Sequence, residues 1–255
     1  MPHNPNWSRE EHIVAFNLYC KIPFTKINEN YPPVVELANI IGRKKGAVSR
    51  KLANFARLDP ALQARNVSGL THGAKGEETV WNEFHDNWEQ LAYESEKILA
   101  KYKGVTLESE IDLSDILEIK EGKERETIVK TRVNQSFFRK AILASYSQTC
   151  CITGIKVPEL LIASHIIPWA HNKKERMNPQ NGLCLNALHD KAFDKGLITI
   201  TPDFKIKISE ALKSNIDGTY MKYFHPYEGK IISLPGRFFP KKEFLEYHSE
   251  QIFAK

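Results

Sequence analysis

Two histidines and one asparagine stand well apart in a single stretch, LLIASHIIPWAHNKKERMNPQNGLCLNALHDKAFDKG, which covers residues 160–196. His165 ends an apolar run, Asn181 follows a polar loop, and His189 comes after a second apolar run. An imidazole can take up a proton near pH 7 or bind a metal ion, and a primary amide can donate and accept hydrogen bonds together. Each of these residues alone would be interpreted as a core or surface residue. Their joint occurrence in this order indicates a catalytic site.

Apolar runs and turn residues predict the elements that must position these side chains. PELLIASHI predicts a strand that delivers the first histidine to its end, because Pro168 cannot continue the ladder. GLCL predicts the pairing strand after a polar, basic loop. Asn186 can then cap a helix that runs from residue 187 to about 195, and Gly196 can end it. The runs LITIT and KIKIS, on either side of Pro202, predict a hairpin.

The stretch resembles the HNH endonucleases, which are ββα-metal nucleases, and more narrowly the bacterial HNH proteins of restriction systems. The motifs SHIIP, NPQNGL and LHDKAFDKGL carry the resemblance, in the family's order and with compatible spacing. The approach RVNQSFFRKAILASYSQTCCITG and the tail GKIISLPGRFFP are similar too, so it covers about residues 126–245. The resemblance implies hydrolysis of DNA phosphodiester bonds to 5′-phosphate and 3′-hydroxyl ends.

The resemblance gives a catalytic role to each of the three residues. His165 matches the general base, which takes a proton from the water that attacks phosphorus. Asn181 matches the asparagine that ties the loop to the strands through side-chain hydrogen bonds. His189 matches a metal ligand on the helix, where a divalent cation would stabilise the departing 3′ oxygen.

One position departs from the family's pattern. Many members carry aspartate or histidine directly before the general base, where it binds the metal, but this chain carries Ser164. We expect Asp194 to substitute, because it lies about one helical turn beyond His189. Asp190 ranks lower, because it points roughly 100° away from the histidine. The expected metal-binding set is therefore His189, Asp194 and Ser164, for Mg²⁺ or Mn²⁺, with Ni²⁺ or Zn²⁺ as alternatives.

The N-terminal part of the chain is predicted to be helical. Ser8 and Glu11 form a capping-box pattern before an apolar helical face. Residues 34–57 predict a helix-turn-helix in which Gly42 takes the tight turn. No acidic residue interrupts the basic side chains of its second half, which favours contact with DNA over the alternative of a solvated basic helix. The expected DNA contacts are Arg43, Lys44, Lys45, Ser49, Arg50 and Lys51, with Lys173, Lys174 and Arg176 in the loop of the catalytic stretch.

Composition divides the chain into three parts and predicts an α+β fold. Residues 1–102 are the helical DNA-binding domain, 103–128 a charged connector with at most one short strand, and 129–255 the HNH nuclease domain. An acidic helix is expected at about residues 78–100, with an aromatic stripe that forms core or a dimer contact. Because one active centre must cut two strands, a homodimer is a further hypothesis. The stripe consists of Val80, Trp81, Phe84, Trp88 and Leu91.

The overall composition excludes several other classes of protein. The chain has 255 residues and a formal net charge of +5, which mildly favours a polyanionic partner. No stretch approaches 18 uncharged apolar residues, so no membrane span is expected. The polar N-terminus lacks the apolar core of a signal peptide, which predicts a cytoplasmic protein with reduced cysteines. No C-x-x-C pair occurs, which excludes a four-cysteine zinc ribbon.

We therefore expect a metal-dependent endonuclease that acts on double-stranded DNA, in restriction or phage defence. The alternative is a DNA-binding regulator whose nuclease module is degenerate, an interpretation that Ser164 favours. A secreted nuclease toxin is disfavoured by the absence of an export signal and by the predicted helix-turn-helix.

Overall fold

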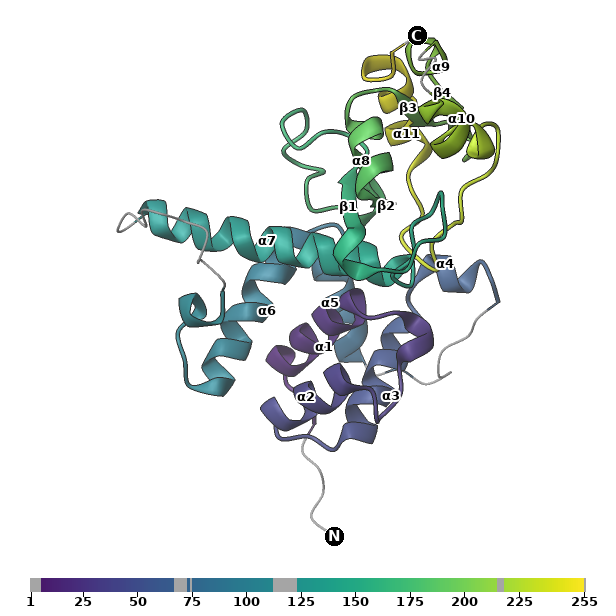
Figure 1. The fold of residues 1–255 in the computed structure, drawn as a ribbon. Helices are drawn as coiled ribbons and strands as arrows, with labels where there is room; N and C mark the ends of the chain where they lie inside the picture. The colour runs from purple at the N-terminus through teal and green to yellow at the C-terminus, as the bar shows by residue number, and fades with distance from the viewer. Residues whose placement is uncertain (1–5, 67–72, 74, 112–122, 215–217, 255) are drawn as a thin grey trace. The chain divides into compact units, whose positions relative to one another are not determined.

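A computed structural model describes residues 6–66, 73, 75–111, 123–214 and 218–254 of the chain (Figure 1). The chain separates into two compact units, Met1–Ala141 and Ile142–Lys255. The described residues are mostly helical, with two small antiparallel sheets, so the predicted α+β class is confirmed. The boundary between the units lies inside helix α7 (Lys123–Ser145), later than residue 129, where composition places it.

The first unit is a helical bundle whose central member is α1 (Arg9–Lys21), which packs against α3, α5 and α6. The predicted capping box is confirmed at its start. The Glu11 amide donates to Ser8 Oγ at 3.1 Å, and the Ser8 amide donates to Glu11 Oε2 at 2.7 Å. The other α-helices described here are α2 (Pro32–Ile40), α3 (Lys45–Ala56), α4 (Pro60–Gln63), α5 (Lys75–Phe84) and α6 (Trp88–Lys103).

Helices α2 and α3 are consecutive, pack against each other and are joined by a tight turn. Gly42 has a φ of +69° there, a left-handed conformation that glycine adopts without strain. Val48, Leu52 and Phe55 form the buried face of α3, as their spacing predicts. Two helices joined in this way also occur in proteins that bind no DNA, so the arrangement alone assigns no function.

The prediction of a single helix at about 78–100 is wrong. The segment forms two helices, α5 and α6, which are separated at residues 85–87, where Asp86 and Asn87 favour a turn over a helix interior. The aromatic stripe forms the core of the first unit. Its five members are at most 7% exposed, and the Trp81 ring lies 5.0 Å from that of Phe16 on α1. The stripe is therefore not available as a dimer contact.

The charged connector is described only in part. Its residues 112–122 lie outside the described ranges, Leu107–Glu110 forms a short 3₁₀ helix, and α7 already begins at Lys123. The portion of the connector that the structure covers contains no strand. Across all the described ranges, no helix is both long and apolar enough to cross a membrane.

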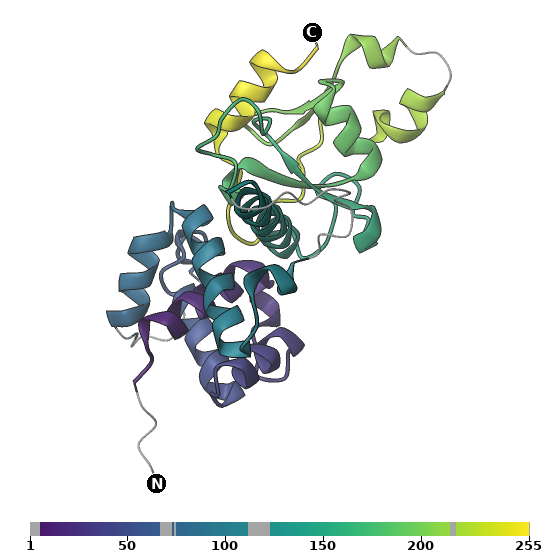
Figure 2. The same cartoon turned by 90° about the vertical axis from the view of Figure 1, so that its left-hand side faces the viewer.

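The second unit carries the predicted strand, strand and helix order. Strand β1 (Leu161–His165) pairs antiparallel with β2 (Gly182–Asn186), and α8 (Ala187–Asp194) packs against both strands (Figures 1 and 2). In the register, His165 lies opposite Gly182 and Leu161 lies opposite Asn186. Helix α8 begins directly after β2, and the last residue of β2 lies opposite the first residue of β1. The helix therefore starts beside the beginning of β1. The remaining strands and α-helices are β3 (Ile198–Ile200), β4 (Ile206–Ile208), α9 (Glu210–Lys213), α10 (Thr219–Tyr223) and α11 (Lys242–Gln251).

Both predicted ends of α8 are confirmed. Asn186 Oδ1 accepts hydrogen bonds from the amides of Leu188 and His189, each at 3.1 Å. Gly196 follows the helix with a φ of +67°, and a Cβ atom there would lie 2.1 Å from the Ile252 carbonyl oxygen. Only glycine fits this position, which fixes the end of α8 against the C-terminal segment. The predicted hairpin is also confirmed, as β3 and β4.

Candidate active site

His165 lies at the end of β1, and its ring is held by the loop between the two strands. Its Nε2 atom lies 3.0 Å from the carbonyl oxygen of Arg176. Since a carbonyl can only accept, Nε2 carries the proton, and Nδ1 keeps the lone pair of the neutral ring. Trp169 stands edge-on to the imidazole, with ring centroids 5.5 Å apart. The contacts thus select both the tautomer and the orientation of the ring.

The surroundings of His165 keep its imidazole neutral. Burial lowers the pKa of His165 below its ordinary value, and the Arg176 carbonyl and the negative charge of Asp194 offset this only in part. A neutral imidazole near pH 7 is the form that can accept a proton. This electrostatic environment therefore suits a general base.

Asn181 braces the loop that holds His165. The residue is 1% exposed, and its Oδ1 atom accepts from the Ile167 amide at 2.8 Å. Its Nδ2 group donates to the carbonyls of Ile167 and Glu175, each at 3.2 Å. Glu175 directly precedes Arg176, so the amide of Asn181 supports the residue pair that presents the carbonyl to His165.

His189 lies in the first turn of α8 and is buried against an aromatic segment. Its ring centroid is 5.1 Å from that of Phe224 and 5.5 Å from that of Tyr227. Nδ1 lies 3.1 Å from Asn186 Oδ1, whereas Nε2 is buried and makes no hydrogen bond of normal geometry. Burial lowers the pKa of His189, and the backbone of Tyr223 offsets this in part. No carboxylate contributes to that shift.

The two carboxylates of α8 interact with the end of β1. Burial raises the pKa of Asp190, the hydroxyl of Ser164 opposes that rise, and the charge of Asp194 adds to it. Burial also raises the pKa of Asp194, and the nearby lysines and His165 oppose that rise. The structure therefore brings Asp194 together with His165, and Asp190 together with Ser164. It shows no interaction between His189 and Asp194, the pair that the sequence predicts to share a cation.

The side chains of β1 and α8 fit some kinds of metal site and not others. Within the described ranges, no three or more His, Cys, Asp and Glu residues are arranged so that they could hold a metal ion. Ser164 is 3% exposed, and its hydroxyl interacts with the carboxylate of Asp190. Mg²⁺ usually takes one or two carboxylates and completes its shell with water and phosphate. The carboxylates of Asp190 and Asp194 have the chemistry of such a partial shell, and they do not fit a closed structural site.

The loop at residues 169–178 presents its basic residues in two ways. Lys173 and Lys174 are exposed. The guanidinium of Arg176 lies over the Trp169 ring, 4.9 Å from its centroid, and its Nε donates to the Trp169 carbonyl at 2.6 Å. Arg176 therefore packs the loop as well as presenting positive charge. Sequence reasoning missed Trp169, although its position directly after SHIIP was a usable signal.

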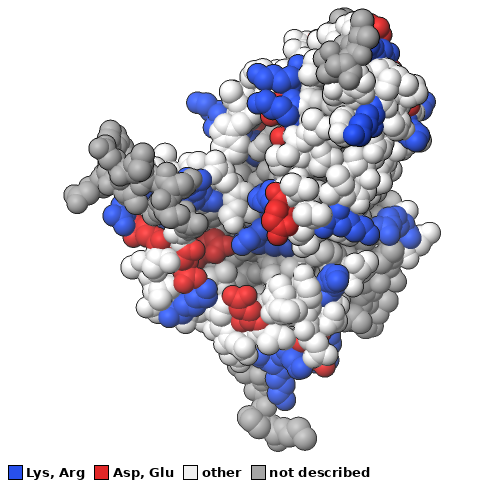
Figure 3. Space-filling view, in the orientation of Figure 1, with Lys and Arg blue, Asp and Glu red and all other residues white. Residues whose placement is uncertain are grey.

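The basic residues of α3 and its preceding turn also divide into two groups. The guanidinium of Arg43 is paired with Glu11 at 2.6 and 2.8 Å, and Lys51 is paired with the fully buried carboxylate of Glu77. These two predicted DNA contacts are thus held in buried ion pairs. Exposed or partly exposed, by contrast, are Lys44, Lys45, Ser49 and Arg50. Figure 3 likewise shows Lys and Arg interspersed with acidic side chains on the visible face, not gathered in one patch.

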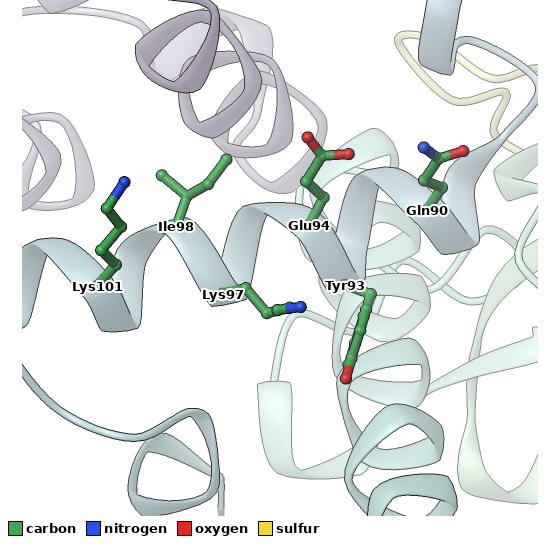
Figure 4. Close-up of a pocket in the computed structure, with 6 residues that line it drawn as sticks. All are labelled: Gln90, Tyr93, Glu94, Lys97, Ile98 and Lys101. Atoms are coloured by element: carbon green, nitrogen blue, oxygen red, sulfur yellow. The ribbon is translucent and has the colours of Figure 1, made fainter.

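A groove of about 580 Å³ on the first unit is not a second candidate (Figure 4). Glu94 in this groove is paired with Arg9, and Lys101 with Glu10. The lining side chains point to two different sides of α6, so they do not converge on one ligand position. They are Gln90, Tyr93, Glu94, Lys97, Ile98 and Lys101.

Residues 150–201 match the model of a family described as HNH endonuclease. These residues form an HNH nuclease domain. The matched range contains β1, β2 and α8, and with them His165, Asn181 and His189. The domain supports nuclease activity in general and implies DNA as the substrate. The comparison with curated proteins gives no match.

Proposed function

We propose that the chain is a metal-dependent DNA endonuclease in which His165 is the general base. The observation that carries this proposal is the hydrogen bond from His165 Nε2 to the Arg176 carbonyl, inside the matched HNH domain. It directs the proton-bearing nitrogen to the loop and leaves Nδ1 as the atom that can accept a proton.

The proposed reaction is the hydrolysis of one phosphodiester bond. His165 Nδ1 takes a proton from water as the water oxygen forms a bond to phosphorus. The bond from phosphorus to the 3′ oxygen breaks, and that oxygen gains a proton from solvent. The products carry a 5′-phosphate and a 3′-hydroxyl. The hydrogen bond to Arg176 holds the imidazole in place as its charge changes.

A divalent cation, when bound, would stabilise negative charge on the phosphate and on the leaving oxygen. The candidate ligands are Asp190, Asp194 and His189 on α8, with Ser164 on the facing strand. Carboxylate ligands favour Mg²⁺ or Mn²⁺, whereas an imidazole ligand would also admit Ni²⁺ or Zn²⁺.

Double-stranded DNA is the proposed partner of both units. In the first unit, the proposed contacts are Lys44, Lys45, Ser49 and Arg50, which lie at the turn and the start of α3. In the second, Lys173 and Lys174 stand on the loop that holds the general base. We also propose a role in restriction or phage defence, which rests on the resemblance alone. A homodimer that cuts both strands is a further part of the proposal and rests on the count of one active centre per chain.

A DNA-binding regulator with a degenerate nuclease module is the second candidate function. Ser164 favours it, because this residue stands where many members of the family carry a metal ligand, and no three-ligand group is present in the described ranges. Metal-dependent cleavage separates the two functions, since a regulator would bind DNA without cutting it.

The test is cleavage of supercoiled plasmid by the full chain in Mg²⁺ or Mn²⁺. We expect His165→Ala to slow cleavage by about 10²–10⁴-fold, the usual contribution of a general base. His171→Ala, which changes an exposed histidine of the same loop, is the matched control and should cleave as the wild type does. Because burial lowers the pKa of His165, the wild-type rate should fall only as pH drops below the ordinary histidine range. Undiminished nicking by His165→Ala would contradict the assignment of the base.

A further inference from the structure

We infer that His248 is a positioning residue of the nuclease, which holds the C-terminal end of α8 in place beside the general base. The inference rests on the proposed function, because it names a residue on which that function depends. His248 lies on α11, beyond the matched residues 150–201, so the family match gives it no role. Its contacts with α8, and the place of that helix beside His165, support the inference.

The imidazole of His248 bonds to two elements at once. The residue is 1% exposed, and its Nε2 atom lies 3.2 Å from the carbonyl oxygen of Phe193 in the last turn of α8. Its Nδ1 atom lies 2.9 Å from the hydroxyl oxygen of Thr199 on β3. Since a carbonyl can only accept, Nε2 donates to Phe193 and Nδ1 accepts from Thr199. This side chain of α11 therefore ties α8 to β3 through two directional bonds.

The ring of His248 also packs against α8. The imidazole lies nearly parallel to the Phe193 ring, with the two centroids 3.6 Å apart and the planes at 10°. Burial lowers the pKa of His248 to about 4, and the Phe193 carbonyl offsets this only in part. The imidazole is therefore neutral near pH 7, and Nδ1 keeps the lone pair that the bond from Thr199 requires.

A second contact of the C-terminal segment holds the same end of α8. The Ala254 amide donates to the carbonyl of Gly196, two residues beyond the helix, at 2.9 Å. Helix α8 has only eight residues, and a helix of this length depends on tertiary contacts for its stability. Its first turn is capped by Asn186, which directly precedes it, whereas its last turn is held from α11 and the residues that follow α11.

The end of α8 that His248 holds carries a carboxylate beside the general base. Asp194 directly follows Phe193 and is the last residue of α8. Its carboxylate interacts with His165, and α8 packs against the strand that ends in this histidine. A shift of Phe193 would move Asp194 with it, because one peptide joins the two residues. Since His248 is buried, it acts on His165 through α8 and does not touch the substrate.

The experiment compares two amide variants of the full chain in plasmid cleavage with Mg²⁺. The side-chain nitrogen of Gln reaches the position of the imidazole Nε2 atom, so His248→Gln can still donate to Phe193. The shorter Asn side chain reaches only the position of Nδ1, so His248→Asn can still accept from Thr199 and loses the bond to α8. Both variants lose the ring and its stacking, and they differ in the bond that they keep.

We expect the kcat of His248→Asn to fall by about 10²-fold with KM within a factor of about two, as when a group near a reacting centre is displaced. His248→Gln should be at least about tenfold faster than His248→Asn, because it keeps the bond to α8. Ser249→Ala is the matched control, because it removes a contact of α11 to the same threonine, and it should cleave as the wild type does.

A merely structural role of His248 would give a different result. The assays run at a temperature where circular dichroism shows each variant to be folded, so a loss of stability alone leaves kcat unchanged. Equal kcat values of His248→Gln and His248→Asn would overturn the inference, as would an equal loss in Ser249→Ala. If the amide variants do not fold, His248→Phe keeps a stacked ring without either bond, and a wild-type kcat of this variant would also overturn it.

Hydrogen exchange separates failure of the inference from failure of the proposed function, because it needs no catalysis. The amides of Gly196 and Leu197 donate to the carbonyls of Phe193 and Ala192 at the end of α8. They should exchange about tenfold faster in His248→Asn than in His248→Gln, as expected when a bond that holds the helix end is lost. If this difference appears but the wild type cuts no DNA, the function fails and His248 still holds α8. If the wild type cleaves and the two variants agree in exchange and in kcat, the inference fails and the function stands.

Discussion

Polar side chains are buried in both units, but their partners differ. In the first unit, Lys51 is paired with Glu77, and Arg43 with Glu11, so each buried charge meets an opposite charge. In the β1–β2–α8 segment, by contrast, Asn181 and His165 bond to the backbone of the loop between the two strands. Paired charges hold the helices of the first unit together, whereas bonds to backbone fix the loop and the orientation of the His165 ring in the second.

This contrast separates residues that look equally functional in the sequence. Arg43 and Lys51 belong to the same basic run as Lys44 and Arg50, and only their burial sets them apart. A basic residue with a buried acidic partner contributes stability, and an exposed one is available to phosphates. The comparison can be tested by changing one residue of each kind.

The largest effect is expected from Lys51→Met, which would leave the Glu77 carboxylate buried without its counter-charge. Breaking a buried ion pair in this way costs about 3–5 kcal/mol of unfolding free energy. Urea unfolding of the full chain measures it. The double variant Lys51→Met/Glu77→Gln should recover part of the loss, because the uncompensated charge is then gone. Lys97→Met, at an exposed position of α6, is the control and should change little.

The opposite result would contradict the distinction between buried and exposed basic residues: Lys51→Met would keep the unfolding free energy of the wild type and lose DNA affinity. Lys51 would then be a DNA contact, and the pairing with Glu77 would be incidental. We expect DNA affinity in the double variant to stay within a factor of about two, well below the tenfold that 1.4 kcal/mol represents.

A smaller effect, in the second unit, is expected from Asn181→Ala. The change removes the bonds to Ile167 and Glu175, and a buried group left unsatisfied costs about 1–3 kcal/mol. The Arg176 carbonyl should then shift, and a displacement of this kind near a reacting centre can slow catalysis about 10²-fold. Plasmid cleavage measures the rate, and urea unfolding measures the stability. Asn172→Ala, at a partly exposed position of the same loop where Oδ1 accepts from the amides of Lys174 and Glu175, should affect both less.

Asn181→Ala also separates an effect on activity from an effect on stability. At a temperature where both variants are folded, it should slow cleavage more than Lys51→Met does. Equal cleavage by Asn181→Ala and the wild type would show that the loop keeps its geometry without the brace. The hydrogen bond from His165 to Arg176 would then not depend on Asn181.

Local signals predicted much of the fold. The capping box of Ser8 and Glu11, and the Asn186 cap with Gly196 at the other end of α8, depend on residues close together in the chain. The strands around the HNH motifs were predictable for the same reason, because apolar runs and turn residues define them. The break between α5 and α6 was missed because an apolar stripe continues across it, and the stripe outweighed Asp86 and Asn87 as a signal.

Partners far apart in the chain were not predictable from the sequence. Arg43 meets Glu11 across 32 positions and Lys51 meets Glu77 across 26, and only the packing of the helices brings these pairs together. The cover over His189 comes from Phe224 and Tyr227, beyond the motif itself. The motif therefore predicted candidate residues for the site and could not predict what each one contacts.

The smallest effect is expected from Lys44→Ala and Arg50→Ala, at exposed positions of the turn and of α3. Each removal of a phosphate contact should weaken DNA binding about equally for all sequences and reduce the salt slope by about 1. Fluorescence anisotropy with labelled duplex at several salt concentrations measures both quantities, with Lys97→Ala as the control. Unfolding free energy should not change, because neither side chain is part of a buried ion pair. If a variant that carries both changes binds duplex with the affinity and salt slope of the wild type, the first unit is a basic bundle that contacts no DNA. The exposed basic residues of α3 then do not differ in function from the buried ones.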